Sequence, residues 1–334
     1  MNYNNNRMVI FISTDNKYAI PAYITLYSML KNYKGNRHVK VYLLTSDDLG
    51  KDRESLLFHL CQLFEFVDIN IINMGDSYDN VTIHTEFITT ATMYRLMIPR
   101  ILIENGEQDI KKCIYLDADT VVEGNIEDLF DVDVEGYCIA GVREKTITCS
   151  CDNGLREQLG VPSLKDYINA GVLMLNLEEI RSNGMDSRME EAGLKNDYRY
   201  NDQDVINSVC YGRIKLLPIK YNVMTSHLSK KDHDTIEEYG HENLAEAMKN
   251  PIVVHYTGSR KPWSYWSEIK ADLWWNYYVM QDIEIKRKYL DPFIREVKLP
   301  IALYIKELVR DLTIRLGIYE PVRALKQAIC DGRK

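Results

Sequence analysis

The sequence lacks any apolar stretch long enough to cross a bilayer. Its first hydrophobic run, residues 9–12, follows a polar segment and is much shorter than the roughly 20 residues that a membrane span needs. We therefore expect neither a cleaved signal peptide nor a membrane-spanning segment in this sequence.

Cysteine is sparse, and basic residues do not dominate the composition. The seven cysteines form no C-x-x-C pair and leave one over, which is typical of a reduced intracellular protein and predicts a cytoplasmic location. With 41 Lys and Arg against 49 Asp and Glu, the net charge is −8. A general nucleic-acid coat needs a basic surface, so we expect no nucleic-acid partner.

Glycine-rich phosphate loops are missing as well. No G-x-G-x-x-G or G-x-x-x-x-G-K-[ST] segment occurs, so a bound nucleotide diphosphate would have to be held by a metal ion and by side-chain cations.

Short β-branched runs alternate with amphipathic stretches along the chain. The first part predicts strands and helices in turn over residues 8–13, 20–33, 39–45, 48–64 and 66–72. Further strands are predicted over residues 112–116, 137–142, 168–177, 214–219 and 252–256. This alternation predicts an α/β fold with a mostly parallel sheet flanked by helices. Ligands bind beyond the carboxyl ends of strands in such sheets, so we search for chemistry there.

The C-terminal part is helical in pattern and basic. From residue 286 onward there are twelve Lys or Arg and six Asp or Glu. Apolar residues recur there at helical spacing: Ile294, Val297, Ile301, Ile305, Leu308, Leu312 and Leu316. Such a helix could lie on an anionic membrane or pack on the domain with its basic face in solvent, and Pro300 should interrupt it.

One acidic triplet lies at a predicted strand end. Of four D-x-D triplets, Asp117-Ala118-Asp119 directly follows an apolar run, which places two carboxylates where the sheet opens. Mg²⁺ and Mn²⁺ prefer such oxygen ligands, although an Asp here could also cap a turn.

Two other segments could complete a site. His255 ends a predicted strand and precedes Gly258 and Lys261; a lone His there is often structural, but Lys261 could offset charge on a diphosphate. In Asp202-Gln203-Asp204, we expect Asp204 to cap a helix starting near residue 205, while Asp202 and Gln203 could point into the cleft.

The chain resembles the family 8 glycosyltransferases, bacterial α-galactosyltransferases of lipooligosaccharide synthesis among them, which are related to glycogenin. The resemblance spans roughly residues 8–265 and consists of TDNKYA (14–19), TMYRL (92–96), YLDADTVV (115–122), NAGVLMLNL (169–177), NDQD (201–204) and HYTGSRKPW (255–263). It implies a GT-A fold over residues 1–265, with a Rossmann-like mixed, mostly parallel sheet flanked by helices, and a helical basic region over 266–334. It also implies a manganese (or magnesium) site and a UDP-sugar donor.

The resemblance also implies roles for single residues. Asp117, Asp119 and His255 would bind the metal, and Gln203, with Asp202 beside it, would lie beneath the anomeric carbon. The remaining donor contacts would come from Thr14, Asp15, Asn16, Arg95, Asp117, Ala118, Asn169, Ala170, Asp202, Gly258 and Lys261. Thr14 stands where relatives often have an acidic residue, and REK at 143–145 stands where they place an Asp, for which Glu144 is the expected substitute.

The resemblance implies a retaining hexosyltransferase that moves galactose or glucose from a UDP-sugar to a glycan or glycolipid, in cell-surface polysaccharide or lipopolysaccharide synthesis. The alternatives are a non-catalytic sugar-nucleotide or glycan-binding protein and a metal-dependent nucleotide-sugar hydrolase. Retention could proceed by front-face attack, which the amide of Gln203 favours, or by double displacement through Asp202. The enzyme would be cytoplasmic or peripheral at the inner face of the membrane.

Overall fold

The computed structural model describes residues 7–46, 48–78, 81–82, 89–150, 152–195, 198–228 and 237–298, together with residues 305, 309, 312 and 316. The chain divides into two compact units, Met1–Ser259 and Arg260–Lys334. The end of the catalytic domain at residue 265 stays a prediction.

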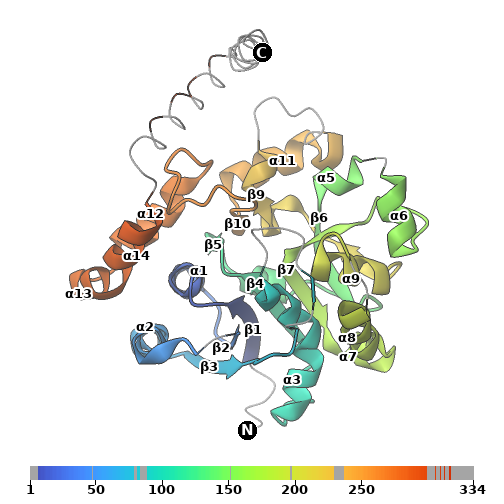
Figure 1. Ribbon diagram of the computed structural model, residues 1–334, viewed down its shortest axis with the longest axis horizontal. Coiled ribbons are helices and arrows are strands. Elements are labelled where there is room, and N and C mark those ends of the chain that lie inside the picture. The colour runs from blue at the N-terminus through green and yellow to red at the C-terminus, as the bar shows by residue number, and fades with distance from the viewer. Residues whose placement is uncertain are drawn as a thin grey trace, which may run out of the picture. The chain divides into compact units, whose positions relative to one another are not determined.

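The first unit is built on two sheets. The strands are β1 (Arg7–Thr14), β2 (His38–Thr45), β3 (Val67–Asn73), β4 (Lys112–Asp117), β5 (Thr120–Val122), β6 (Ile139–Arg143), β7 (Ile168–Asn176), β8 (Ile214–Leu216), β9 (Val223–Met224) and β10 (Val253–His255). The large sheet has the order β3-β2-β1-β4-β7-β6-β8, and β5-β10-β9 form a small one (Figure 1). Each of the eight predicted strands matches one of these ten, and the two short strands β5 and β9 were not predicted.

The large sheet is mixed rather than wholly parallel. Strands β3, β2, β1 and β4 run parallel to one another, and β6 runs parallel to β8, whereas β7 is antiparallel to both β4 and β6. The prediction of a mixed, mostly parallel sheet is confirmed, although the apolar run of β7 by itself carries no information on strand direction.

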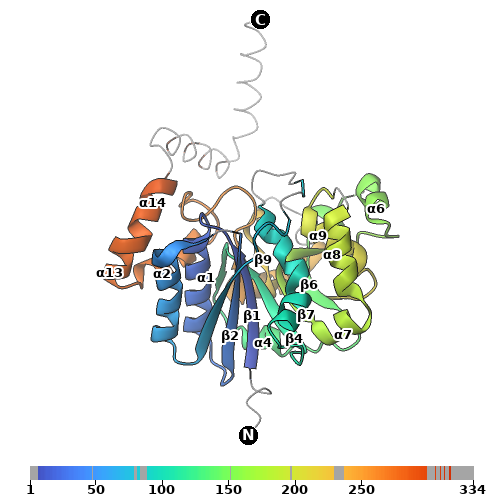
Figure 2. The same cartoon turned by 60° about the horizontal axis from the view of Figure 1, so that its bottom comes forward.

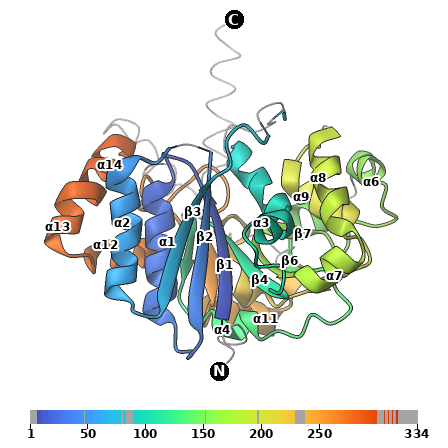
Figure 3. The same cartoon turned by 90° about the horizontal axis from the view of Figure 1, so that it is seen from below.

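Helices cover both faces of the large sheet. The helices are α1 (Ala19–Asn32), α2 (Gly50–Leu63), α3 (Ile98–Glu104), α4 (Glu127–Phe130), α5 (Lys145–Thr148), α6 (Asn153–Leu159), α7 (Leu177–Ser182), α8 (Met185–Lys195), α9 (Asn201–Val209) and α11 (His241–Lys249). Short helical turns are η2 (Thr90–Met97), η3 (Ile219–Tyr221) and η4 (Thr225–His227). Figure 2 and Figure 3 show α1 and α2 on one face and α3, α7, α8 and α9 on the other.

The central strands are buried on both faces. Every residue of β7 is buried, and Met8 to Ile12 on β1 are at most 1% exposed. Because helices exclude water from both sides, these strands read as continuous apolar runs rather than alternating ones. That is the physical reason why the sequence alone locates them.

The second unit packs around aromatic rings. Its helices are α12 (Ala271–Val279), α13 (Ile283–Ile285), η5 (Lys286–Leu290) and α14 (Asp291–Val297). Trp274, which is 1% exposed, contacts the rings of Trp263, Trp275 and Tyr278. The helical region predicted for residues 266–334 is thus seen up to Val297, while Pro300 lies outside the described residues. Among those that are described, no helix combines the length and apolar character that crossing a bilayer requires.

Candidate active site

Two aspartates and a distant histidine meet at the carboxyl end of β4. Asp117 is the last residue of β4, Asp119 lies in the turn to β5, and His255 ends β10. One ligand atom from each lies within 4.8 Å of the others. His255 Nε2 is 3.2 Å from Asp119 Oδ1 and 3.7 Å from Asp117 Oδ2.

The small sheet brings His255 to the carboxylates. Strand β10 pairs antiparallel with β5, so that His255 lies opposite Thr120, directly after the acidic triplet. The backbone N–H of Tyr256 donates to the carbonyl of Asp119 at 3.0 Å, and Thr120 Oγ1 donates to the carbonyl of Asp117 at 2.9 Å. The backbone itself therefore holds the three side chains in one place.

Gly171 on β7 makes room for the cluster. A methyl carbon added there would lie 2.6 Å from Asp117 Oδ2 and 2.7 Å from His255 Nδ1, and it would overlap His255 Cε1 outright. The sequence contained a signal for this close approach, a glycine inside an otherwise bulky apolar strand, which our reading of the sequence did not use.

The donor set fits a divalent cation. Two carboxylates and one imidazole nitrogen are ligands that Mn²⁺ or Mg²⁺ accept, and three protein ligands leave positions for substrate oxygens. The side chains of Asp117 and Asp119 are 23% and 14% exposed, so the carboxylates are open on one side. These residues could hold the metal that the sequence predicts.

Arg95 on η2 binds two carboxylates of the site, those of Asp117 and Asp202. Its guanidinium is buried, and it binds Asp117 Oδ1 at 2.8 Å, Asp202 Oδ2 at 3.1 Å and the carbonyl of Ala170. It also lies over the ring of Tyr115, 4.2 Å from the centroid. Direct contact of Arg95 with a donor sugar stays a prediction; its described contacts orient Asp117 and Asp202.

Asp202 is fully buried beside Arg95. Burial raises the pKa of Asp202 to about 6, with Asp117 adding to the rise and Arg95 opposing it. At neutral pH, the charged and protonated forms of Asp202 therefore differ less in free energy than the two forms of an exposed aspartate do.

Helix α9 presents the rest of the N-D-Q-D segment. The helix begins at Asn201, earlier than the expected start near residue 205. Asp204 accepts a hydrogen bond from the backbone N–H of Tyr200 at 2.8 Å, just before the helix, and another from Tyr167 at 2.5 Å. The prediction that Asp204 caps the helix is wrong, because the helix starts earlier and Tyr200 occupies the cap position. Asp204 lies within the helix and binds the N–H of that cap residue.

Gln203 is held by its amide oxygen. Gln203 Oε1 accepts hydrogen bonds from Asn169 Nδ2 and from the backbone N–H of Ala170, both at 3.1 Å, and Nε2 donates to Tyr167 at 3.2 Å. The structure therefore brings together Asn169, Ala170, Asp202 and Gln203, the residues predicted around the donor sugar. Their contacts with the sugar itself stay predictions.

Glu144 lies next to these residues and accepts a hydrogen bond from Asn169. Its carboxylate accepts hydrogen bonds from Thr146 at 2.6 Å and Asn169 Nδ2 at 3.1 Å, and it pairs with His227 Nε2 at 2.8 Å. Burial alone would raise the pKa of Glu144, but the hydrogen bond and charge of His227 lower it. Our reading of the sequence missed His227, which no motif marks.

The predicted nucleotide residues follow β1, next to β4. Ser13 pairs with Asp117, so Thr14, Asp15 and Asn16 continue along the same sheet edge. Asp15 Oδ1 accepts hydrogen bonds from the backbone N–H groups of residues 17 and 18 at 2.8 and 2.9 Å. Burial raises the pKa of Tyr18, and the carboxylates of Asp119, Asp15 and Asp117 add to the rise.

The predicted diphosphate residues fall in different units. Gly258 has a φ of 76° and ends the first unit with a left-handed turn that favours glycine. Lys261 belongs to the second unit, and its role beside a diphosphate stays a prediction.

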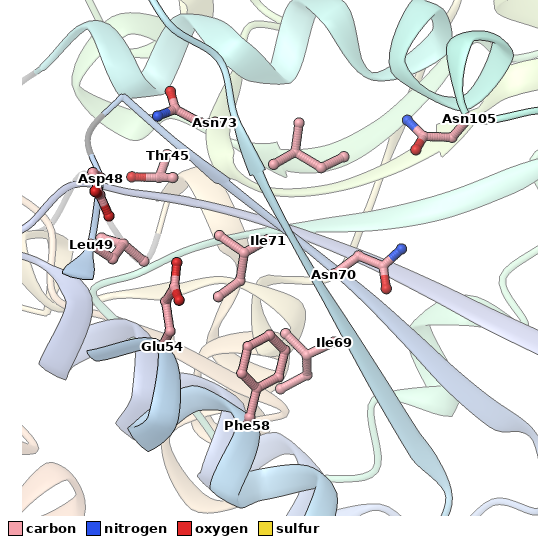
Figure 4. A pocket seen from close by; sticks show the side chains of 11 residues that line it. Thr45, Asp48, Leu49, Glu54, Phe58, Ile69, Asn70, Ile71, Asn73 and Asn105 are labelled. Carbon is pink, nitrogen blue, oxygen red and sulfur yellow. The ribbon is translucent and has the colours of Figure 1, made fainter. Parts of the chain in front are cut away.

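A separate pocket of about 560 Å³ lies at the free edge of the large sheet. Figure 4 shows Glu54 and Phe58 rising from α2 toward Ile69 and Ile71 of β3. None of the predicted site residues lines this pocket, so we assign the chemistry to the Asp117–Asp119–His255 cluster instead.

The comparisons with known proteins agree with this geometry. A model of the family described as glycosyl transferase family 8 matches residues 9–267. The chain belongs to glycosyl transferase family 8. The predicted membership is confirmed, and with it the assignment of this protein as a glycosyltransferase.

Individual relatives match most of the chain. General stress protein A of Bacillus subtilis is 27% identical over 268 residues, which are 77% of this chain and 87% of that protein. A lipopolysaccharide 1,2-glucosyltransferase of Escherichia coli is 25% identical over 276 residues, 79% of this chain and 76% of that protein.

A solved glycosyltransferase structure confirms the GT-A fold. The galactosyltransferase LgtC, crystallised with donor and acceptor sugar analogues, superposes with a TM-score of 0.67 over 84% of this chain and 100% of its own. Its sequence identity is 19%, so this likeness concerns the fold alone.

Proposed function

We propose that this family 8 enzyme transfers glucose or galactose from a UDP-sugar to a glycan or glycolipid acceptor, with retention of anomeric configuration. The observation that carries this proposal is the Asp117–Asp119–His255 cluster, which opens beside the buried Arg95–Asp202 pair. The activity of the lipopolysaccharide 1,2-glucosyltransferase among its sequence relatives supports a hexose donor. The acceptor glycan would belong to cell-surface polysaccharide or lipopolysaccharide.

The main task in this reaction is to stabilise charge on the departing UDP. When bound by Asp117, Asp119 and His255, Mn²⁺ or Mg²⁺ supplies positive charge at the diphosphate. Thr14, Asp15 and Asn16 would hold the uridine, and Gly258 and Lys261 the diphosphate. Arg95 keeps the Asp117 carboxylate aimed at the site, because its guanidinium binds Asp117 and Asp202 at once.

Front-face attack accounts best for retention. In this step the acceptor oxygen bonds to the anomeric carbon on the side that the phosphate leaves, and the phosphate oxygen takes the acceptor proton. Gln203 is a poor nucleophile, since its amide oxygen already accepts two hydrogen bonds from Asn169 and Ala170. Asp202 is paired with Arg95, which disfavours a covalent sugar ester there.

The test is a panel of nucleotide sugars with Mn²⁺, following UDP release, thermal stabilisation and the anomeric configuration of the product by NMR. We expect stabilisation by UDP and turnover of UDP-glucose or UDP-galactose that depends on a glycan acceptor. UDP release that is unchanged by acceptors would support hydrolysis instead, and a sugar ester on Asp202 found by mass spectrometry would support double displacement.

We propose in addition that the second unit contacts an anionic membrane from the cytoplasmic side. Trp266, Val279, Met280 and Ile283 are each more than half exposed, and a basic run follows at Lys286, Arg287 and Lys288. Aromatic and apolar side chains beside basic ones are typical of peripheral membrane surfaces. Sedimentation with vesicles of anionic lipid, but not of neutral lipid, is the expected result, and equal recovery with both would contradict it.

A further inference from the structure

A buried hydrogen-bond relay connects the donor-sugar residues to His255. It begins at the backbone of β7, where the N–H of Gly171 donates to Asn169 Oδ1 at 2.9 Å. A backbone N–H can only donate, so the atom of Asn169 that faces it must be the amide oxygen. The nitrogen of the same amide then faces Glu144 Oε2 and Gln203 Oε1, both at 3.1 Å and both acceptors.

A second backbone N–H independently fixes the orientation of the Gln203 amide. The N–H of Ala170 donates to Gln203 Oε1 at 3.1 Å, which fixes the amide of Gln203 with its oxygen toward β7. That oxygen is the one that accepts from Asn169 Nδ2. Two adjacent backbone donors therefore agree on the orientation of both amides, which the shape of an amide group alone does not determine.

Asn222 connects the amide of Asn169 to His255 of the Asp117–Asp119–His255 cluster. Asn222 is 0% exposed and lies between η3 and β9, and its Nδ2 donates to Asn169 Oδ1 at 2.9 Å. Its Oδ1 must then face His255 Nδ1, at 3.1 Å. An amide oxygen has no proton to give, so the proton in this hydrogen bond belongs to His255 Nδ1.

We infer that Asn222 is a positioning residue that fixes the proton of His255 on Nδ1 and thereby leaves Nε2 as the metal-binding nitrogen. This inference rests on the proposed metal site. Nε2 is the ring nitrogen that faces the carboxylates of Asp119 and Asp117, at 3.2 and 3.7 Å. A histidine that binds a metal through one nitrogen commonly donates from the other to an oxygen, which fixes both ring orientation and tautomer.

The relay also gives Asn169 a defined task. Its amide makes two donor and two acceptor bonds, with Glu144, Gln203, Asn222 and Gly171. These four bonds match the full capacity of a side-chain amide. Asn169 thus couples the position of Gln203, beneath the donor sugar, to the orientation of the metal ligand His255.

The direct test uses the unaltered protein without metal. In ¹⁵N-histidine-labelled enzyme kept in chelator, two-bond ¹H–¹⁵N correlations report which ring nitrogen carries the proton, and His255→Gln identifies the signal. We expect a proton on Nδ1 in every case, both when the ring is cationic and Nε2 donates to the carboxylates, and when the ring is neutral. A neutral ring with its proton on Nε2 overturns the inference.

Substitutions of Asn222 give a second test through metal affinity. Asn222→Ala removes the acceptor of the Nδ1 proton, and we expect Mn²⁺ binding, measured by electron paramagnetic resonance, to weaken about 10- to 100-fold. Asn222→Asp keeps an acceptor oxygen for Nδ1, so its affinity should exceed that of Asn222→Ala by about tenfold. Wild-type affinity in Asn222→Ala, or equal losses in both variants, overturns the inference.

Asn176→Ala is the matched control. Asn176 is a buried asparagine at the opposite end of β7, where its amide donates to the carbonyl of Val134 at 2.9 Å and accepts from the N–H of Glu179 at 3.2 Å. The Asn176→Ala variant should bind Mn²⁺ as the unaltered protein does, because the hydrogen bonds of Asn176 lie outside the relay. An unaltered protein that binds no Mn²⁺ would contradict the proposed metal site, while the tautomer measurement would still test the relay.

Discussion

Replacing Gly171 by alanine should damage the metal site far more than the fold. Gly171 has no positive φ, so alanine is compatible with its backbone. The new methyl carbon, however, would lie 2.6 Å from Asp117 Oδ2 and 2.7 Å from His255 Nδ1, whereas ordinary contacts begin at 3.4 Å. Asp117 must therefore retreat by about 0.8 Å, and His255, whose Cε1 the added carbon would overlap, must retreat further than that.

The size of the effect follows from that displacement. A misplacement of about 1 Å in a catalytic constellation can cost on the order of 100-fold, so we expect Mn²⁺ affinity and transfer to fall by roughly that factor. Overpacking of this kind destabilises a protein by about 1–3 kcal/mol, which most domains of this size survive.

The assay compares Mn²⁺ binding by isothermal titration calorimetry with urea unfolding of the metal-free protein. Gly193→Ala is the control, because its added carbon would meet the mobile ends of Leu96 and Met93, at 2.9 and 3.1 Å, rather than ligand atoms. We expect similar unfolding free energies for the two variants but a loss of metal affinity in Gly171→Ala alone. Wild-type Mn²⁺ affinity in Gly171→Ala would refute the close-packed cluster.

Three further substitutions test the site. Asp119→Ala removes one predicted ligand and should lower transfer about 100- to 1000-fold, so full activity under strict metal control would exclude the role. Arg95→Lys cannot bind Asp117, Asp202 and a backbone carbonyl at once, and urea unfolding should show a loss of about 1–3 kcal/mol; an unchanged midpoint would contradict this. Asp202→Asn tests the raised pKa of about 6: the folded state holds that proton more tightly than the unfolded chain, so the stability that Asp202 contributes must fall as pH rises from about 4 to about 6. In chelator, the unfolding free energy of the unaltered protein should therefore decline relative to Asp202→Asn across that window, and parallel curves would disprove the shift.

Much of the scaffold was predictable from the sequence because burial on both faces leaves a plain signal. The runs that form β1, β2, β4 and β7 are continuous and apolar, and each was expected as a strand. The acidic triplet was placed correctly at a strand end for the same reason. The reversed direction of β7 was not predictable, since an apolar run is the same for a parallel and an antiparallel neighbour.

The contacts within the site required the tertiary structure. Strand β9 has two residues, too few for a periodic pattern. It pairs with β10, however, and Asn222, directly before β9, thereby lies within hydrogen-bond distance of His255. No local spacing connects Gly171 with Asp117, which meet through the pairing of β7 with β4. Nor does any connect Asn222 with Asn169, because Asn222 precedes a strand of the small sheet and Asn169 lies on the large one.

The amino-acid sequence by itself determined the class of fold, the family and the residue types available for chemistry, because apolar periodicity and short motifs are local properties. The tertiary structure alone decided which of those residues act together. Hydrogen bonds have direction, and only the packed chain, with the N–H of Gly171 pointing at Asn169 and Asn222 enclosed between two partners, gives His255 one orientation and one tautomer.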